Sequence, residues 1–305
     1  MNPDLGSRTA IITGATGFVG YHLTRHLVAS GWTVHAIVRP QSKTLSLLQM
    51  GNRLTIHRFY GSTAEMIELV KEIKPDIVFH LASLFLAQHQ QRDVVPMIHT
   101  NIAFGTQLLE AMNASGVYRF VNTGTSWQHY ENKSYSPVCL YASTKQAFES
   151  VLTYYTEATP LQAVTLKLFD TYGPLDARPK LFSLLQKTAR EQNPLPMSAG
   201  EQLIDLVYID DVVNAYCLAA ERLLEGKTAQ KSESFAVSSG NPVTLKNLVS
   251  VYEKVLGKTL PIQWGARPYR PREVMTPWNR WEPVPNWLPL IDLETGIRKI
   301  LSHVG

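Results

Sequence analysis

The chain has 305 residues and a net charge of +4, and 45% of its residues are hydrophobic while 18% are charged. This composition is that of an ordinary globular protein and excludes a chain that stays disordered. No lysine and arginine stripe and no apolar run of 18 residues is present, so we expect neither a nucleic-acid partner nor a membrane partner.

The cysteines and the first residues indicate the cellular compartment of the protein. Cys139 and Cys217 are too few for a disulfide framework and indicate a reducing environment. The opening MNPDLGSRTAIITGATG lacks the basic and then apolar layout of a signal peptide. We therefore expect a cytoplasmic protein.

Short β-branched runs alternate with helical patterns over the first 170 residues. Strands are predicted at residues 9–13, 33–38, 54–59, 76–82, 119–123 and 163–169. Helices are predicted at residues 19–30, 44–50, 64–73 and 94–115 and in the segment LYASTKQAF that starts at residue 140. This alternation predicts an α/β fold, a Rossmann-type doubly wound parallel sheet with helices on both faces.

The composition changes after residue 170, where proline, glycine and aromatic residues become dense around helices at 208–224 and 244–256. We predict a Rossmann domain over residues 1–170. Residues 171–305 are predicted to form a smaller lobe on the sheet edge that makes most of the substrate contacts, with some segments returning to the first domain.

The first strand ends on a glycine-rich turn. ITGATGFVG places Gly14, Gly17 and Gly20 at a G-x-x-G-x-x-G spacing, and a helix opens at Phe18. Glycines let the backbone turn sharply and approach a pyrophosphate, which the free N–H groups of a helix N-terminus can bind. The turn therefore predicts that residues 1–170 bind NAD or NADP; a strand-to-helix turn without a ligand is the alternative.

The end of the second strand predicts which dinucleotide is used. Folds that select NAD often carry an acidic residue there, which holds the ribose 2′-hydroxyl. This chain has Arg39, followed by Ser42 and Lys43. A guanidinium suits a 2′-phosphate, so we expect NADPH/NADP+ rather than NAD; a solvated surface arginine is the alternative.

Tyr141 and Lys145 lie four residues apart in a helical pattern and therefore share a face. The ammonium group is expected to lower the pKa of the phenol and make it a usable proton donor near neutral pH. Taken alone, the pair is better explained by a solvated lysine beside a half-buried tyrosine, because this spacing is common by chance.

Eight segments in order carry a resemblance to a known family: TGATGFVG, KPDIVFHLAS, TNIAFGTQLLEA, FVNTGTSW, YASTK, KLFDTYGP, YIDDVV and YRPREV. Together they resemble the extended short-chain dehydrogenase/reductase family over nearly the whole chain, within it the nucleotide-sugar epimerases, dehydratases and ketoreductases. The resemblance implies that Tyr141 donates a proton to a substrate carbonyl oxygen. It also implies that Lys145 binds the nicotinamide ribose and lowers the tyrosine pKa, and that Thr125 binds the same substrate oxygen.

The resemblance also implies contacts to both ligands, with Asn101 as a structural residue. The implied cofactor contacts are Gly14, Thr16, Gly17, Phe18, Val19, Arg39, Ser42, Lys43, Ser62, Leu81, Ala82, Ser83, Thr123, Tyr141, Lys145, Phe169 and Thr171. The implied contacts to a nucleotide-diphosphate sugar are Phe85, Thr125, Ser126, Trp127, Asp170, Lys180, Leu181, Arg270 and Glu273. Arg270 would pair with the diphosphate, a task that Arg272 could share.

Three positions depart from the family pattern. Asp170 replaces a common asparagine, and its carboxylate must point away or be neutralised by a nearby cation if a diphosphate binds there. Ser62 stands where many relatives carry an acid that reads adenine, and Ile204 replaces a frequent arginine. Adenine recognition is therefore expected to be weaker or built differently.

The residues after Thr125 exclude some of the reactions that this family catalyses. Ser126, Trp127 and Gln128 offer none of the acids that sugar 4,6-dehydratases of this family carry there, and Cys139 lies outside the slot that a 3,5-epimerising reductase would use. We expect Cys139, His80 and His129 to be structural, and no metal-ligand spacing is present.

The residues therefore favour an NADPH-dependent reductase that acts on the C4 ketone of a nucleotide-linked 4-keto-6-deoxyhexose. A nucleotide-sugar 4-epimerase that retains NAD(P) and a non-catalytic NADPH-binding module are the alternatives. The nucleotide stays open between dTDP, CDP, GDP and UDP. By analogy with the family, a homodimer is expected through the helices around residues 94–115 and 141–158.

Overall fold

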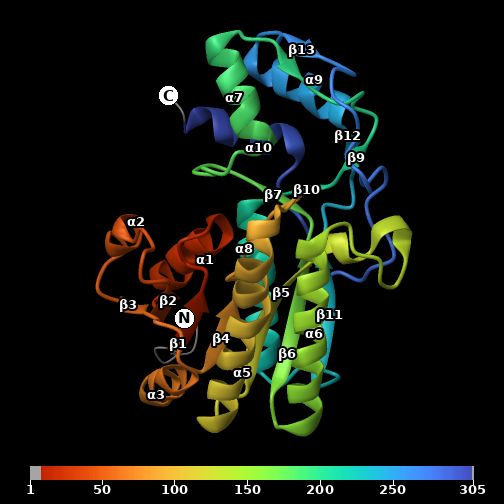
Figure 1. Cartoon of the computed structure of the whole chain (residues 1–305). Coiled ribbons are helices and arrows are strands. Elements are labelled where there is room, and N and C mark those ends of the chain that lie inside the picture. The colour runs from red at the N-terminus through yellow and green to blue at the C-terminus, as the bar shows by residue number, and fades with distance from the viewer. Residues whose placement is uncertain (1–7, 304–305) are drawn as a thin grey trace.

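The computed structural model describes residues 8–303 and contains a central sheet of seven parallel strands (Figure 1). The strand order is β11–β6–β5–β4–β1–β2–β3, which confirms the predicted Rossmann-type class. The strands are β1 (Thr9–Thr13), β2 (Thr33–Val38), β3 (Leu54–Arg58), β4 (Ile77–His80), β5 (Arg119–Thr125), β6 (Gln162–Leu168) and β11 (Ser232–Val237).

Helices cover both faces of the sheet because its strands are apolar on both sides. Ile11 and Ile12 of β1 point to opposite faces, and both are fully buried. Ile11 joins a core with α3, α5 and α6, whereas Ile12 joins a core with α1 and α8. These helices are α1 (Phe18–Ala29), α3 (Thr63–Ile73), α5 (Phe104–Ala114), α6 (Leu140–Ala158) and α8 (Ile209–Leu224). A short helix, α2 (Leu45–Leu48), follows β2.

The helix predicted at residues 94–115 is divided. α4 (Val94–Ile98) leads into a π-helical segment, His99–Ala103, and then into α5. Such wide turns occur often at functional sites. Here the π segment contains Asn101, which lies buried beneath the loop that follows β4.

Two segments after residue 170 return to the sheet: α8 packs on one face and β11 extends the edge beside β6. The remaining elements form an upper lobe with its own core of α7, α9 and α10. The lobe lies beyond the carboxyl ends of the strands, whereas the sequence predicted it along the sheet edge (Figure 1). Its elements are α7 (Leu181–Glu191), β8 (Leu195–Pro196), β9 (Leu203–Ile204), β12 (Val243–Thr244), α9 (Leu245–Leu256), β13 (Ile262–Gln263) and α10 (Leu293–Ser302).

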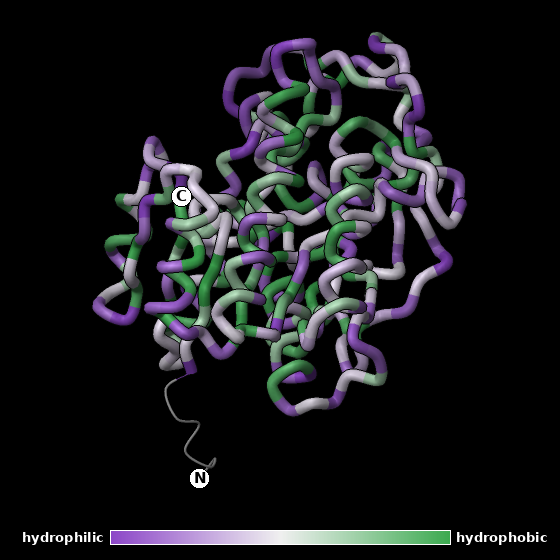
Figure 2. The backbone as a smooth tube through the Cα atoms, turned by 60° about the horizontal axis from the view of Figure 1, so that its bottom comes forward, coloured by the Kyte–Doolittle hydropathy of each residue, from purple (hydrophilic) through white to green (hydrophobic). Residues whose placement is uncertain are grey.

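A parallel pair of short strands, β7 (Asp170–Tyr172) and β10 (Leu206–Tyr208), joins the sheet to the lobe. Hydrophobic segments lie mainly in the interior of both parts, and hydrophilic ones lie mainly in the outer turns (Figure 2). Within residues 8–303, no helix has the length and apolar character needed to cross a bilayer.

Candidate active site

The glycine turn after β1 is built so that other residues would not fit. Gly14 has a φ of 76°, and a Cβ there would lie 2.6 Å from the backbone nitrogen of Ala82. A Cβ on Gly20 would lie 2.1 Å from the carbonyl oxygen of Gly14. Gly17 donates its N–H to that same oxygen at 2.9 Å. The close approach of backbone to backbone fits the cradle that a dinucleotide pyrophosphate needs at the start of α1.

A cleft of about 570 Å³ opens beside this turn, at the carboxyl ends of β1, β2 and β4. It brings together eight of the predicted cofactor residues, which are Gly14, Thr16, Gly17, Arg39, Ser42, Leu81, Ala82 and Ser83. Sequence reasoning missed other lining residues, among them His99 and Gln107. They come from the π segment and α5, which only the fold brings to the cleft.

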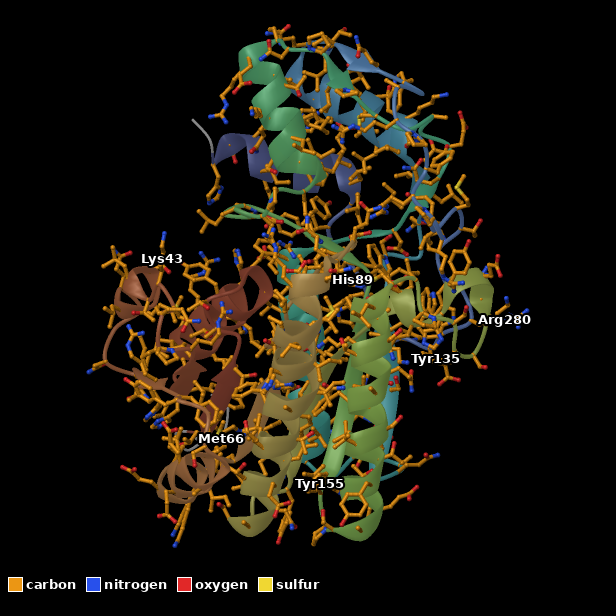
Figure 3. All side chains as sticks on the ribbon, in the orientation of Figure 1. Lys43, Met66, His89, Tyr135, Tyr155 and Arg280 are labelled. Carbon is orange, nitrogen blue, oxygen red and sulfur yellow. The ribbon has the colours of Figure 1, made fainter. Side chains whose placement is uncertain are left out.

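The other predicted cofactor residues lie outside this lining. Lys43 and Ser62 are exposed, and Lys43 projects from the segment before α2 (Figure 3). Thr123 is buried in β5, where its hydroxyl bonds with Tyr216 at 2.6 Å. Phe169 packs against Trp281, with 6.3 Å between ring centroids.

Phe18, Val19 and Thr171 have different surroundings. Phe18 and Val19 open α1 and are partly buried against the core. Thr171 belongs to β7 and lines the second cavity described below. These three residues are therefore not among those that line the cleft.

Asn101 fixes the loop that follows β4. Its side-chain oxygen accepts hydrogen bonds from Leu84 N–H at 2.7 Å and from the Ser83 hydroxyl at 3.1 Å. Its amide group donates to the Leu84 carbonyl at 3.1 Å and to the Thr144 hydroxyl at 2.9 Å. The asparagine thus ties the residues after β4 to the helix that carries Tyr141.

Tyr141, Lys145 and Thr125 meet where β5 ends beside α6. Tyr141 is 8% exposed and Lys145 is 2% exposed. Burial raises the pKa of Tyr141 above its ordinary value of 10, although hydrogen bonds with the Ser83 and Thr125 hydroxyls oppose the shift. The expectation that Lys145 lowers this pKa towards neutrality is wrong for this geometry, because loss of water around the phenol is the larger effect.

Burial also acts on Lys145, since a buried ammonium group loses its hydration. The pKa of Lys145 falls to about 8 through desolvation, which the charge of Glu149 partly opposes. Tyr141 is therefore a protonated phenol at neutral pH, and Lys145 is the group of the pair that titrates closest to neutrality.

Thr125 is held by the short 3₁₀ turn that follows it. Its side-chain oxygen accepts the N–H of Trp127 at 3.3 Å, and Gln128 completes a capping box with it. The side chain of Gln128 accepts the N–H of Thr125 at 3.0 Å. With its lone pairs facing these donors, the Thr125 hydroxyl can direct its proton towards Tyr141.

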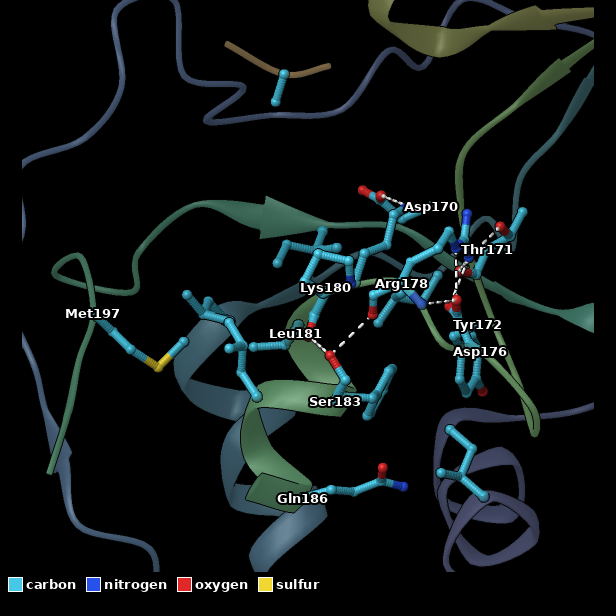
Figure 4. A pocket seen from close by; sticks show the side chains of 18 of the residues that line it. Asp170, Thr171, Tyr172, Asp176, Arg178, Lys180, Leu181, Ser183, Gln186 and Met197 are labelled. Carbon is cyan, nitrogen blue, oxygen red and sulfur yellow. Dashed lines mark hydrogen bonds and ion pairs between the residues drawn. The ribbon is translucent and has the colours of Figure 1, made fainter. Parts of the chain in front are cut away.

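A larger cavity of about 830 Å³ lies between the strand ends and the upper lobe (Figure 4). The predicted substrate residues that line it are Phe85, Trp127, Asp170, Lys180, Leu181, Arg270 and Glu273. Ser126 instead lines an adjoining cavity of about 110 Å³ that shares Trp127 and Arg270 with the larger one.

Aromatic side chains form the wall next to Tyr141. The ring of Phe85 meets Tyr141 edge to face at 4.9 Å and Trp127 at 5.5 Å, measured between ring centroids. This wall is apolar and contributes no acid or base to the cavity.

Lys180, Arg270 and Arg178 in the cavity each pair with a carboxylate. Lys180 pairs with Asp170 at 3.6 Å, so the neutralisation that the sequence required for Asp170 is present. Arg270 donates two hydrogen bonds to Glu273, at 2.6 and 2.9 Å. The carboxylate fixes the plane of the guanidinium, which suits bidentate binding of a phosphate.

Arg178 is a cavity residue that sequence reasoning missed. It pairs with Asp176 through two bonds of 2.6 Å and donates to the Thr171 carbonyl at 3.2 Å (Figure 4). It lies in YGPLDARPK, residues 172–180, in which only Lys180 is predicted from the sequence as a ligand contact. Its charge also lowers the pKa of Tyr141, against the larger effect of burial.

The remaining polar candidates have structural surroundings. His80 shares a hydrogen bond of 2.9 Å with Thr13, and burial lowers its pKa to about 3. Arg272 donates to the Pro137 carbonyl at 3.0 Å and to the Ser136 hydroxyl at 2.7 Å, so it holds the loop before α6. Both cysteines are free. Residues 8–303 contain no cluster of three or more metal-ligating side chains.

A glycine turn at the sheet switch point, a buried Thr–Tyr–Lys trio and an adjoining cavity that carries several cations define an oxidoreductase-type enzyme of the Rossmann class. A family model described as the NAD dependent epimerase/dehydratase family matches residues 10–233. The chain belongs to this family, which confirms the resemblance to extended short-chain dehydrogenases/reductases.

Curated relatives match over nearly their full length. The CDP-abequose synthase of Salmonella typhimurium is 27% identical over 303 residues, which cover 96% of this chain and 97% of the relative. The CDP-abequose synthase of Salmonella muenchen is 26% identical over 302 residues, with 97% and 98% coverage.

Solved structures show the same fold. The UDP-glucuronic acid 4-epimerase of Bacillus cereus, in complex with UDP-glucuronic acid and NAD, is 25% identical with a TM-score of 0.81. The match covers 97% of this chain and 98% of that one. The UDP-glucose 4-epimerase of Thermotoga maritima, with UDP-glucose, has a TM-score of 0.83 at 21% identity, covers 97% and 98% of the two chains, and supports the fold alone.

Proposed function

We propose that this enzyme reduces the C4 ketone of a nucleotide-linked 4-keto-6-deoxyhexose and uses NADPH as the reductant. The nicotinamide cofactor, when bound, supplies the hydride. Tyr141 donates the proton to the C4 oxygen, Thr125 holds that oxygen by a hydrogen bond, and Lys145 positions the cofactor ribose. Donors fixed in advance stabilise the negative charge that develops on the carbonyl oxygen.

The burial of Tyr141 is the observation that carries this proposal. Burial raises the pKa of the phenol, so Tyr141 stays protonated at neutral pH. A protonated phenol is the form that a reductase needs, because reduction of a ketone consumes one proton. An enzyme that starts by oxidising a hydroxyl group needs a base at this position instead.

The wall beside Tyr141 supports a 6-deoxy sugar. Trp127 presents an aromatic ring where a dehydratase of this family would require an acid, and Phe85 packs against it at 5.5 Å. An apolar surface favours a methyl group over a hydroxyl group, because the hydroxyl would lose its hydrogen bonds to water. Lys180 lies over the ring of Phe85 and Arg270 over the ring of Trp127, at 5.3 and 5.6 Å from the ring centroids, so cations for a diphosphate stand beside this wall.

The preference for NADPH rests on Arg39 and Ser42, which line the cofactor cleft at the end of β2. Since Lys43 lies outside this lining, the proposal assigns the 2′-phosphate to Arg39 and Ser42. The choice of nucleotide rests on the relatives: those named CDP-abequose synthase favour a CDP-linked substrate, whereas the solved epimerases contain UDP-linked ligands.

Net consumption of NADPH tests the proposal. Purified protein is mixed with CDP-linked and dTDP-linked 4-keto-6-deoxyhexoses, and NADPH loss is followed by absorbance together with formation of the C4 hydroxyl product. We expect one NADPH consumed for each ketone reduced. Failure of every nucleotide-linked ketosugar to oxidise NADPH would contradict the proposed activity.

A nucleotide-sugar 4-epimerase is the second candidate, because epimerases with NAD and a UDP-sugar are 25% identical to this chain. An epimerase returns the hydride to its own substrate, so UDP-glucose or UDP-glucuronic acid would change configuration without net oxidation of the cofactor. A non-catalytic NADPH-binding module would bind the cofactor and change neither class of sugar.

A homodimer belongs to the same proposal. Val95 on α4 and Tyr154 on α6 are 65% and 64% exposed, although both are large and apolar. Their helices are those through which the family commonly pairs. Light scattering coupled to gel filtration should give twice the chain mass of 34.2 kDa, and charged substitutions at both positions should give monomers.

A further inference from the structure

A chain of buried hydrogen bonds leads from the backbone of Thr125 to α6. Gln128, which is fully buried, accepts the Thr125 N–H and donates to Glu149 at 3.0 Å and to Gln146 at 2.8 Å. Gln128 thus accepts one hydrogen bond and donates two, and each of the three has a protein partner. The carboxylate of Glu149 therefore supports the backbone of Thr125 through one intervening side chain.

Glu149 is also half of a buried ion pair. Its second oxygen lies 3.3 Å from the ammonium group of Lys167 on β6, and the two side chains are 16% and 8% exposed. Lys167 donates in turn to Nε2 of His129 at 2.9 Å. Because an ammonium group only donates, Nε2 must accept, and Nδ1 of His129 then donates its proton to the Lys133 carbonyl at 3.2 Å.

The carboxylate lies directly against the strand that carries Thr125. A Cβ on Gly124 would lie 2.9 Å from the nearer oxygen of Glu149 and 3.1 Å from Cγ of Lys167. The absence of a side chain at Gly124 therefore lets this ion pair reach the end of β5. No part of the mechanism described above uses Glu149, Lys167 or His129.

Lys145 lies one helical turn before Glu149 on α6 and is almost fully buried. The groups that face it are Tyr141 and Glu149 on its own helix and His80 on β4. Tyr141 keeps its proton and His80 stays neutral, because burial raises the first pKa and lowers the second to about 3. Glu149 is thus the anionic group that acts on this ammonium.

We propose that Glu149 is a positioning residue of the active site, which holds Thr125 in place through Gln128 and places a negative charge one helical turn from the buried Lys145. Lys167 is the counter-ion of this carboxylate in its largely buried position. The assignment rests on the proposed function, since it concerns the same Thr125–Tyr141–Lys145 trio.

The negative charge of Glu149 can be removed with little change in the shape of the side chain. In Glu149→Gln the side-chain oxygen can still accept from Gln128, whereas the negative charge is lost. The alkaline limb of kcat/KM should then move to lower pH by about one unit, since loss of a nearby anion lowers an ammonium pKa. Glu157→Gln, an exposed position further along α6, is the matched control and should leave the limb in place.

A second readout does not depend on activity. With ¹⁵N-labelled lysine, the Nζ resonance of Lys145, assigned by Lys145→Arg, should titrate near pH 8 in the wild-type protein and at lower pH in Glu149→Gln. If the single variant fails to fold, Glu149→Gln/Lys167→Met removes both charges of the buried pair and should move the resonance in the same direction.

The two proposals fail separately. An unmoved Lys145 titration, or a uniform loss of kcat with an unmoved alkaline limb, would overturn the role of Glu149 and leave the reductase intact. A shifted titration in a protein that reduces no ketosugar would support the charge assignment and overturn the proposed reaction.

Discussion

Arg178 lies across the ring of Phe18, with 4.5 Å between the guanidinium carbon and the ring centroid. Phe18 is the first residue of α1 and follows the glycine turn, whereas Arg178 belongs to the loop that lines the substrate cavity. The loop that carries Arg178 therefore lies against the start of α1, where the carbonyl of Pro174 also bonds with Nε2 of His22 at 3.1 Å, and we expect it to cover the glycine turn.

Removal of this contact should speed the release of the cofactor. Arg178→Ala deletes the cation–π contact, so the dissociation rate of NADPH should rise roughly 3- to 30-fold. Stopped-flow displacement, followed by NADPH fluorescence, measures this rate. Arg25→Ala is the control, because Arg25 lies over Tyr21 on the outer side of α1 and should leave release unchanged. Equal rates in wild type and Arg178→Ala would refute the covering role.

Tyr141→Phe should abolish turnover and leave cofactor binding intact. The change removes the proton donor but keeps the ring that packs against Phe85, so we expect a loss of about 10²–10⁴-fold in kcat. Steady-state assays and fluorescence titration with NADPH measure the two effects. Tyr154→Phe, on the exposed side of the same helix, should keep full activity. Retained activity in Tyr141→Phe would revive the reading of the protein as a binding module.

The choice of cofactor should depend on Arg39. Arg39→Ala removes the cation that lines the cleft, so the Kd for NADPH should rise about 10- to 100-fold, which corresponds to about 1.5–3 kcal/mol. The Kd for NADH should change little, because NADH has no 2′-phosphate. Lys43→Ala, outside the lining, should have the smaller effect. A wild-type protein that binds NADH better than NADPH would end the NADPH assignment.

Arg270→Lys should weaken binding of the nucleotide sugar. Lysine keeps the charge but loses the planar pair of donors that Glu273 orients, so we expect KM to rise about tenfold with a smaller change in kcat. The exposed Arg280 offers the control Arg280→Lys, which should leave KM unchanged (Figure 3). A change confined to kcat would place Arg270 away from the diphosphate.

His80 should make the fold sensitive to acid. Its pKa is about 3 in the folded protein and 6.5 ordinarily, so the unfolded chain binds an additional proton as the pH falls below 6.5. His80 should therefore cost about 1.4 kcal/mol of unfolding free energy per pH unit between pH 6 and 4, and nothing above pH 7. Urea unfolding should show a shallower pH slope for His80→Gln, with His26→Gln on the exposed side of α1 as control. Identical slopes would contradict the assignment.

Local sequence patterns predicted the elements that depend on neighbouring residues. The spacing of Gly14, Gly17 and Gly20 indicated the turn, because backbone approach at each glycine is decided within a few residues. The requirement that Asp170 be neutralised was also predicted, and Lys180 meets it. Both conclusions follow from sterics and charge that do not depend on the path of the chain elsewhere.

Other features could not be derived in this way. Spacing placed Tyr141 and Lys145 on one face of a helix, but the direction of the tyrosine pKa shift depends on how completely the surrounding residues exclude water from the phenol. Arg178 had no signal of its own, since its partner Phe18 is 160 residues away in the sequence and close only in the fold. The same holds for the Glu149–Lys167 pair, which joins α6 to β6.

The sequence by itself determined the α/β class and the glycine turn, because hydrophobic period and backbone freedom are local properties, whereas the candidate proton donor was implied by the family resemblance. Only the tertiary structure decided the protonation of Tyr141, the partners of each buried charge and the residues that line both cavities. The protonation states, the ion pairs and the cavity linings depend on desolvation and on contacts between distant segments. Both exist only in the folded chain.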